Sequence, residues 1–322
     1  MRGLGLARLG PVIAALVCIA PAAGETLGNA LRASGARVTA QTVPDAGVPI
    51  ASHAVLRDRQ AYVIVYYRDQ GTGALVPPLF VGRLDRLTGR WMQAAIDEQA
   101  IRPAPSACLG SALSARKAGG MLLVETHVNP SAGCTLVLAE DLAVRDVLSG
   151  WPVAVFADGR VVYQHSQPHF FAVHPLEVSI YDPRSRGHRA LYPPKPPPPL
   201  RLEHMRKIQT LYTPDWCNAR NHPCDPERFD ERIEGPVEVS DKTGALAFVA
   251  AFDNTVFADD GAAAPPTPAV KPTEVLYVYR RLAGRETPDV RELPFAEARR
   301  RFGGTRLKQY VEPATLDRIF RP

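Results

Sequence analysis

The chain has 322 residues, of which 46% are hydrophobic and 22% are charged, so it can bury the core of an ordinary globular protein and is not disordered throughout. Its 31 prolines argue against long uninterrupted helices and exclude the all-α classes. The net charge of +5 comes from 38 basic and 33 acidic residues spread along the chain. Nucleic-acid-binding proteins cluster their basic residues, so no nucleic-acid partner is expected.

Residues 1–24 have the pattern of a secretory signal peptide. Arg2 and Arg8 precede an apolar run over residues 9–20. This run is too short to span a bilayer, and small residues follow it. No later apolar run approaches the length of a transmembrane helix. We therefore expect a periplasmic or extracellular protein that does not insert into a membrane once the signal is removed, with an N-terminal segment over residues 25–52.

From residue 53 onward, apolar and polar residues alternate with a period of two, which predicts β-strands. The strands fall into four modules of four strands each, and short turns such as Asp158-Gly159 link them. The predicted strands begin at His53 and then occupy residues 62–67, 79–84 and 91–96; 108–116, 121–127, 134–139 and 142–148; 152–157, 160–165, 176–181 and 188–192; 236–240, 245–252, 274–280 and a last strand that ends near Leu293.

Four-stranded modules of roughly 40–50 residues are typical of the blades of a β-propeller. The segments 156–163 (FADGRVVY) and 180–192 (IYDPRSRGHRALY) resemble blade repeats of the secreted bacterial propellers that are similar to the periplasmic Tol-system propeller. That family serves mainly in binding, so the resemblance implies a binding function and no catalytic residue. The predicted fold is all-β and propeller-like, with four to six blades over residues 53–293; a fifth blade would draw on residues 37–43.

Two segments depart from the strand pattern. The insertion over residues 193–235 opens with a proline-rich spacer, continues with apolar residues at helical spacing over 200–211, and ends in a loop that contains two cysteines. It predicts a mixed helical and loop insertion. The C-terminal tail, residues 294–322, predicts two helices, over 294–302 and 314–320.

Removal of the signal peptide leaves four cysteines, an even number, in an oxidising compartment. Their spacing favours disulfides between Cys108 and Cys134 and between Cys217 and Cys224. The alternative is a zinc site formed by Cys217, His222 and Cys224, although Cys-x4-His-x-Cys is not a characteristic zinc-finger spacing. Export favours oxidation, so disulfides are the preferred interpretation and no cofactor is expected.

In a propeller, the connections from the second to the third strand and from the fourth strand to the next blade open on one face, and the other two turns open on the opposite face. Loops on a rigid scaffold commonly carry binding residues. The longest connections of this chain all fall on one predicted face. Aromatic, imidazole and amide side chains combine contact area with a polar group and mark the candidate binding site. These candidates are His165, Gln167, His169, Phe170, Phe171, His174 and Trp216.

The histidines of this loop admit two interpretations. They could bind a metal ion, or they could donate to backbone carbonyls and pack with the neighbouring phenylalanines at the channel mouth. No carboxylate lies close in sequence before Asp182, so no metal site is assigned.

The sequence therefore predicts an exported, propeller-like binding or interaction protein whose partner is an unidentified protein or glycan. No serine-hydrolase elbow, phosphate-binding loop or dinucleotide motif occurs, and no catalytic residue is assigned. The alternative is a secreted hydrolase that acts on a glycan or peptide at the loop-rich face. That alternative requires two or three carboxylates to converge on one pocket there.

Overall fold

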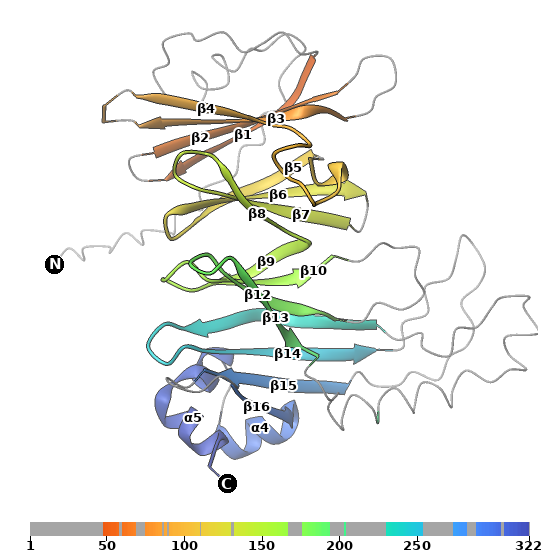
Figure 1. Ribbon diagram of the computed structural model, residues 1–322. Coiled ribbons are helices and arrows are strands. Elements are labelled where there is room, and N and C mark those ends of the chain that lie inside the picture. Colours follow the sequence, from red (N-terminus) through yellow and green to blue (C-terminus); the bar gives the residue numbers. More distant parts are fainter. Residues whose placement is uncertain are drawn as a thin grey trace, which may run out of the picture.

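The computed structural model describes residues 48–57, 60–68, 75–85, 87–88, 90–109, 111–129, 132–166, 176–193, 203, 230–253, 273–281, 288–303 and 306–321. These residues form four sheets, and each sheet consists of four strands that follow one another in the chain. Every neighbouring pair of strands is antiparallel. The sheets are stacked in chain order, with the first and last at opposite ends (Figure 1). The predicted mostly-β fold is confirmed; a ring that closes the first sheet onto the last is not seen in this described part.

The strands of the four sheets have the following bounds. The first sheet contains β1 (Val48–Arg57), β2 (Gln60–Arg68), β3 (Leu75–Asp85) and β4 (Trp91–Ile96). The second contains β5 (Ser111–Ala118), β6 (Met121–Asn129), β7 (Ala132–Leu138) and β8 (Val144–Leu148). The third contains β9 (Gly150–Val155), β10 (Val161–His165), β11 (Val178–Asp182) and β12 (Gly187–Tyr192). The fourth contains β13 (Asp230–Ser240), β14 (Ala245–Asp253), β15 (Thr273–Arg280) and β16 (Asp289–Pro294).

The four predicted modules coincide with the four sheets, and their strand boundaries differ at several places, of which three bear on the argument. β1 begins at Val48, before the predicted start, and β13 begins at Asp230, inside the expected insertion. The prediction that Cys108 starts a strand is wrong, because this residue lies in the 3-10 helix η1 (Ser106–Leu109). In this turn Cys108 packs against the second sheet, where its disulfide partner Cys134 lies.

β14 shows why the strands are so apolar. All residues from Ala245 to Phe252 are buried. Those of one face, including Phe248, pack with the third sheet, and those of the other, including Val249, pack with the C-terminal helices. A strand buried on both faces has no solvent-exposed face to mark with polar residues, so its sequence is a continuous apolar run.

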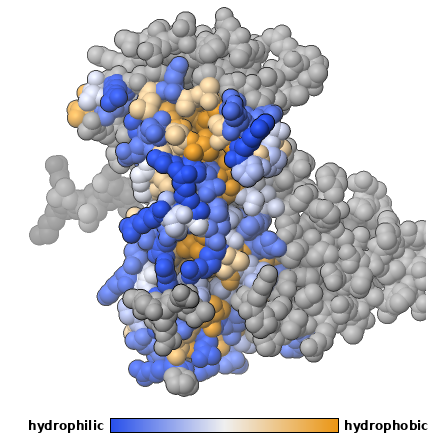
Figure 2. Space-filling view, viewed as in Figure 1, coloured by the Kyte–Doolittle hydropathy of each residue, from blue (hydrophilic) through white to orange (hydrophobic). Residues whose placement is uncertain are grey.

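Hydrophobic side chains fill each space between neighbouring sheets. Separate clusters join the first sheet to the second, the second to the third, and the third to the fourth. Between the last two sheets, the rings of Phe248 and Tyr277 stack with centroids 4.9 Å apart, and Tyr192 meets both edge-on. Hydrophilic residues dominate the described surface in Figure 2, and hydrophobic ones show in smaller areas between them.

The C-terminal tail covers the free face of the fourth sheet. It contains α4 (Phe295–Phe302), η2 (Leu307–Val311) and α5 (Pro313–Ile319), so both predicted helices are confirmed, and η2 is additional. Gly303 ends α4 with φ of 70°, a left-handed conformation that favours glycine. Tyr310, Leu316 and other tail residues are buried against this sheet. No helix in the residues described above is both long and apolar enough to cross a membrane.

Several predicted features lie outside the described residues. They are the signal peptide over 1–24, most of the N-terminal segment over 25–52 including residues 37–43, and nearly all of the insertion over 193–235 with its pair Cys217 and Cys224. Within the insertion, Glu203 is helical, inside the range predicted as a helix.

Candidate functional site

The short turns of neighbouring sheets lie together at one edge of the stack. The backbone N–H of Ala157, in the β9–β10 turn, donates to the carboxylate of Asp241, in the β13–β14 turn, at 2.7 Å. Gly119, in the β5–β6 turn, lies against Gly159, so that a Cβ atom on Gly119 would be 3.2 Å from the Gly159 Cα. The turns of the second, third and fourth sheets therefore share one edge.

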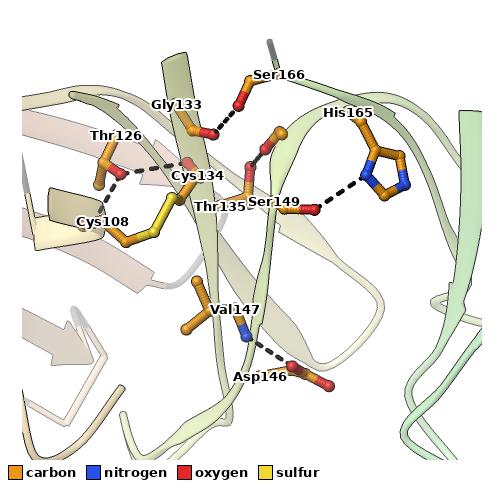
Figure 3. Close-up of a disulfide and its surroundings, with 11 residues drawn as sticks. Cys108, Thr126, Gly133, Cys134, Thr135, Asp146, Val147, Ser149, His165 and Ser166 are labelled. Atoms are coloured by element: carbon orange, nitrogen blue, oxygen red, sulfur yellow. Dashed lines mark hydrogen bonds between the residues drawn. A yellow bond between two sulfur atoms is a disulfide. The ribbon is translucent and has the colours of Figure 1, made fainter. Parts of the chain in front are cut away.

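The disulfide between Cys108 and Cys134 lies at the beginning of β7, and β7 ends toward the short turns. Its Cα atoms are 5.3 Å apart, which confirms one of the two predicted pairs. The Thr126 hydroxyl lies 2.8 Å from the carbonyl oxygen of Cys108 and 3.3 Å from that of Cys134, so one buried hydroxyl holds both halves of the bridge (Figure 3). The bridge ties η1, which precedes the second sheet, to the third strand of that sheet.

A cleft of about 760 Å³ opens beside this bridge. We call it the disulfide cleft. Residues 100–108 form one wall, and the other wall is formed by edge strand β8 and the connections around it. The lining residues outside 100–108 are Gly133, Cys134, Val144, Arg145, Asp146, Val147, Ser149, Ser166 and Arg186. The hydroxyl of Ser166 donates to the Gly133 carbonyl at 2.7 Å and fixes the start of the loop that follows β10 (Figure 3).

His165 is tied into the interface between the second and third sheets. Its Nδ1 lies 3.1 Å from the hydroxyl of Ser149, and its Nε2 lies 2.8 Å from the hydroxyl of Ser179 (Figure 3 shows the first contact). A neutral imidazole carries one N–H, so one serine accepts a hydrogen bond from the ring and the other donates to it. Burial lowers the pKa of His165, and the Glu177 carboxylate, whose Oε2 is 4.0 Å from Nδ1, opposes that shift.

A second histidine continues this polar chain toward the edge of the stack. The Tyr163 hydroxyl, which also bonds Ser179, lies 3.1 Å from Nδ1 of His188. Nε2 of His188 lies 3.1 Å from the carboxylate of Asp146 on β8. Burial raises the pKa of Tyr163, which remains a protonated phenol. Hydrogen bonds thus join Asp146 of the second sheet, and Ser149 of the connection between the two sheets, to side chains of the third sheet.

The disulfide cleft carries more positive than negative charge. Arg102, Arg145 and Arg186 line it, whereas Asp146 is its only carboxylate among the described residues. Within that same part of the chain, none of these guanidinium groups forms an ion pair, and all three residues are exposed. Exposed, unpaired guanidinium groups are free to bind an acidic ligand.

Of the predicted binding residues, only His165 falls within the described residues. Gln167, His169, Phe170, Phe171, His174 and Trp216 lie outside them. His165 stands at the end of β10, as predicted, and its ring contacts two serine hydroxyls in place of the expected backbone carbonyls. In the ranges described, no group of three His, Cys, Asp or Glu side chains is placed to hold a metal ion.

Sequence reasoning missed Tyr163, Ser179, His188 and Asp146. One signal was available, because residues 163 and 165 are two apart on one strand and their side chains therefore share a face. Asp146 lies 42 positions from its partner His188, on another sheet, and no local pattern reports such a contact. The sequence matches no known protein-family model and no curated protein.

Proposed function

We propose that this chain is an exported, propeller-like binding protein that holds an acidic, extended segment of a partner protein in the disulfide cleft. The observation that carries the proposal is the cleft itself, with its three unpaired arginines and a wall fixed by a covalent bridge. A rigid wall reduces the entropy lost on binding. The signal-peptide pattern and the disulfide support export.

The lining favours a protein partner over a glycan. Sugar rings are commonly held by stacking on aromatic side chains, and none of the described lining residues is aromatic. The apolar contacts come instead from Ile101, Pro103, Pro105, Val144 and Val147. Alternating apolar and acidic side chains on an extended segment would meet these residues and the arginines at once.

The propeller-like arrangement is part of this proposal. It is supported by the sequential strand order of every sheet, by face-to-face packing of consecutive sheets, and by the contact of first strands, β1 with β5 and β9 with β13. The resemblance of residues 156–163 and 180–192 to secreted bacterial propeller repeats supports it further. Because the tail covers the free face of the fourth sheet, the sheets form an open arc in this proposal.

A secreted hydrolase remains the second candidate because one set of side chains has a suitable order. The carboxylate of Glu177, the imidazole of His165 and the hydroxyl of Ser179 follow the acid, base and nucleophile sequence of serine hydrolases. Ser179, however, is only 6% exposed and lies inside a strand, where a substrate carbonyl has no access. Binding is therefore the better-supported function.

The test compares peptide binding by two matched variants. Ala107 and Ala143 are both exposed, but only Ala107 lines the disulfide cleft. A short peptide of alternating glutamate and valine should bind the wild type and Ala143→Trp equally and bind Ala107→Trp at least tenfold more weakly. The same peptide with lysine for glutamate should not bind.

Equal binding to both tryptophan variants, or preferential binding of soluble oligosaccharides, would contradict the proposal. Hydrolysis of a nitrophenyl ester by the wild type that is lost in Ser179→Ala would favour the hydrolase.

A further inference from the structure

Beyond the proposed function, a second hollow lies at the short-turn edge, between the second and third sheets. Its volume is about 520 Å³, and we call it the tyrosine pocket. Tyr181 of β11 lines it together with Arg145 and Arg186, which also line the disulfide cleft. The other lining residues are Gly120, Met121, Ala139, Glu140, Asp141 and Pro183. This volume lies within the range of small-molecule sites.

The hydroxyl of Tyr181 is the unusual group in this pocket. The residue is 0% exposed, and its hydroxyl has no hydrogen-bond partner in the described structure. Leaving a buried hydroxyl unpaired destabilises the folded state, so native proteins rarely do so without a reason. Burial raises the pKa of this phenol, which keeps it protonated and therefore able to donate.

The charges around this hydroxyl define what it can bind. Arg145 and Arg186 are the two cations that act on it, and Asp146 and Asp182 are the two anions. Glu140 and Asp141 add further negative charge to the lining. Two guanidinium groups beside several carboxylates suit a ligand with a single negative charge better than a doubly charged phosphate. Met121 and Pro183 offer apolar contact to the rest of such a ligand.

We propose that the tyrosine pocket binds a small organic monocarboxylate, whose oxygens accept hydrogen bonds from the Tyr181 hydroxyl and from the guanidinium groups of Arg145 and Arg186. The arginine side chains are exposed and can turn toward the carboxylate, which uncovers the phenol beneath them. Arg186 has φ of 53° and lies in the turn between β11 and β12, which places this residue in the lining of the pocket. The ligand therefore supplies the partner that the buried phenol lacks.

The test uses two tyrosines of the same interface as a matched pair. Tyr163→Phe removes a hydroxyl that bonds His188, whereas Tyr181→Phe removes one that bonds nothing in the described residues. Hexanoate, benzoate and N-acetylalanine serve as probes, with hexanamide and inorganic phosphate as controls, and binding is measured by ligand-observed NMR and by the shift of the melting temperature.

At least one of the three carboxylates should bind the wild type, and neither control should. Tyr181→Phe should weaken that binding about tenfold, the loss of one hydrogen bond to a charged group, while the melting temperature of the free protein stays the same or rises. Tyr163→Phe should lower the melting temperature and keep the affinity. Arg186→Asn, in which asparagine tolerates the left-handed backbone, should also weaken binding at least tenfold.

Four results would overturn the assignment: no carboxylate binds, the amide binds as well as the acid, phosphate binds in place of the carboxylates, or Tyr181→Phe lowers stability and leaves affinity unchanged. Ala107→Trp separates this site from the proposed function, because it blocks the disulfide cleft and does not touch the tyrosine pocket. Loss of peptide binding without loss of carboxylate binding in that variant would therefore keep the two sites distinct.

Discussion

Removal of the Cys108–Cys134 disulfide should destabilise the protein through its unfolded state. The two cysteines are 26 positions apart in sequence. Closing a loop of that length restricts the unfolded chain by about 3.5 kcal/mol according to loop-closure entropy, which is one of two accounts of how disulfides stabilise proteins. Both cysteines are buried, so alanine is the substitution that adds no polar group to their site.

The assay is urea unfolding of the double variant Cys108→Ala with Cys134→Ala, followed by tryptophan fluorescence. Given slopes of about 1–3 kcal/mol/M, the midpoint should fall by about 1 M or more. The acidic peptide should also bind more weakly, because residues 100–108 lose the tie that holds them as a cleft wall. A midpoint equal to that of the oxidised wild type would refute the reasoning, as would alkylation of both thiols in the native, unreduced protein.

Three further results are expected. Gly150→Ala should lower the free energy of unfolding by about 3 kcal/mol, because the added Cβ would lie 1.9 Å from a backbone carbonyl oxygen. Gly120→Ala is the control and should be nearly neutral in thermal unfolding, because its Cβ would lie 3.7 Å from the nearest atom, a carboxylate oxygen of Glu140. The folded state lowers the pKa of His165 below its ordinary value of 6.5, so near that pH the unfolded chain binds a proton more readily than the folded protein. The free energy of unfolding should therefore fall as the pH drops through 6.5. Urea titrations at several pH values should show a shallower fall for His165→Asn than for the wild type. Tyr277→Phe should lower the free energy of unfolding by about 1–2 kcal/mol, because the Tyr277 hydroxyl donates to a buried carbonyl of β12. Tyr310→Phe is the control: its hydroxyl has no partner among the described residues, so calorimetry should detect no loss of stability.

The strands were predictable because their signals are local. The apolar run of β14 and the alternation in β9 each report burial within a few residues, and the Asp158-Gly159 turn marks where the chain reverses. The first helix of the tail was equally predictable, because a proline precedes α4 and a glycine ends it. Such signals define four sheets, but they do not contain the angle between one sheet and the next, so closure of the stack could not be derived from them.

The candidate site depended on contacts that no local pattern encodes. Arg145 lies on β8, and only the packing of the second sheet against the third makes it a neighbour of Tyr181, whereas Arg186 lies in the turn that follows β11. The unpaired hydroxyl of Tyr181 is likewise invisible in sequence, since a tyrosine in an alternating strand is an ordinary core residue. Of the predicted binding residues, His165 is the one that lies in the described part of the chain, at the end of a strand where a long loop begins.

The last two of the three interfaces in the stack differ in a way that bears on where ligands bind. The third and fourth sheets meet through aromatic rings, and the Tyr277 hydroxyl donates to a carbonyl of β12 between them. The second and third sheets pack through an apolar cluster and are also joined by the hydrogen bond from His188 to the Asp146 carboxylate, while Ser149, on the connection between them, contacts His165. Both the disulfide cleft and the tyrosine pocket open along this second kind of interface. A directional interface holds β8 at a defined position against the third sheet, and that position is what sets the spacing of the arginines on either side of it.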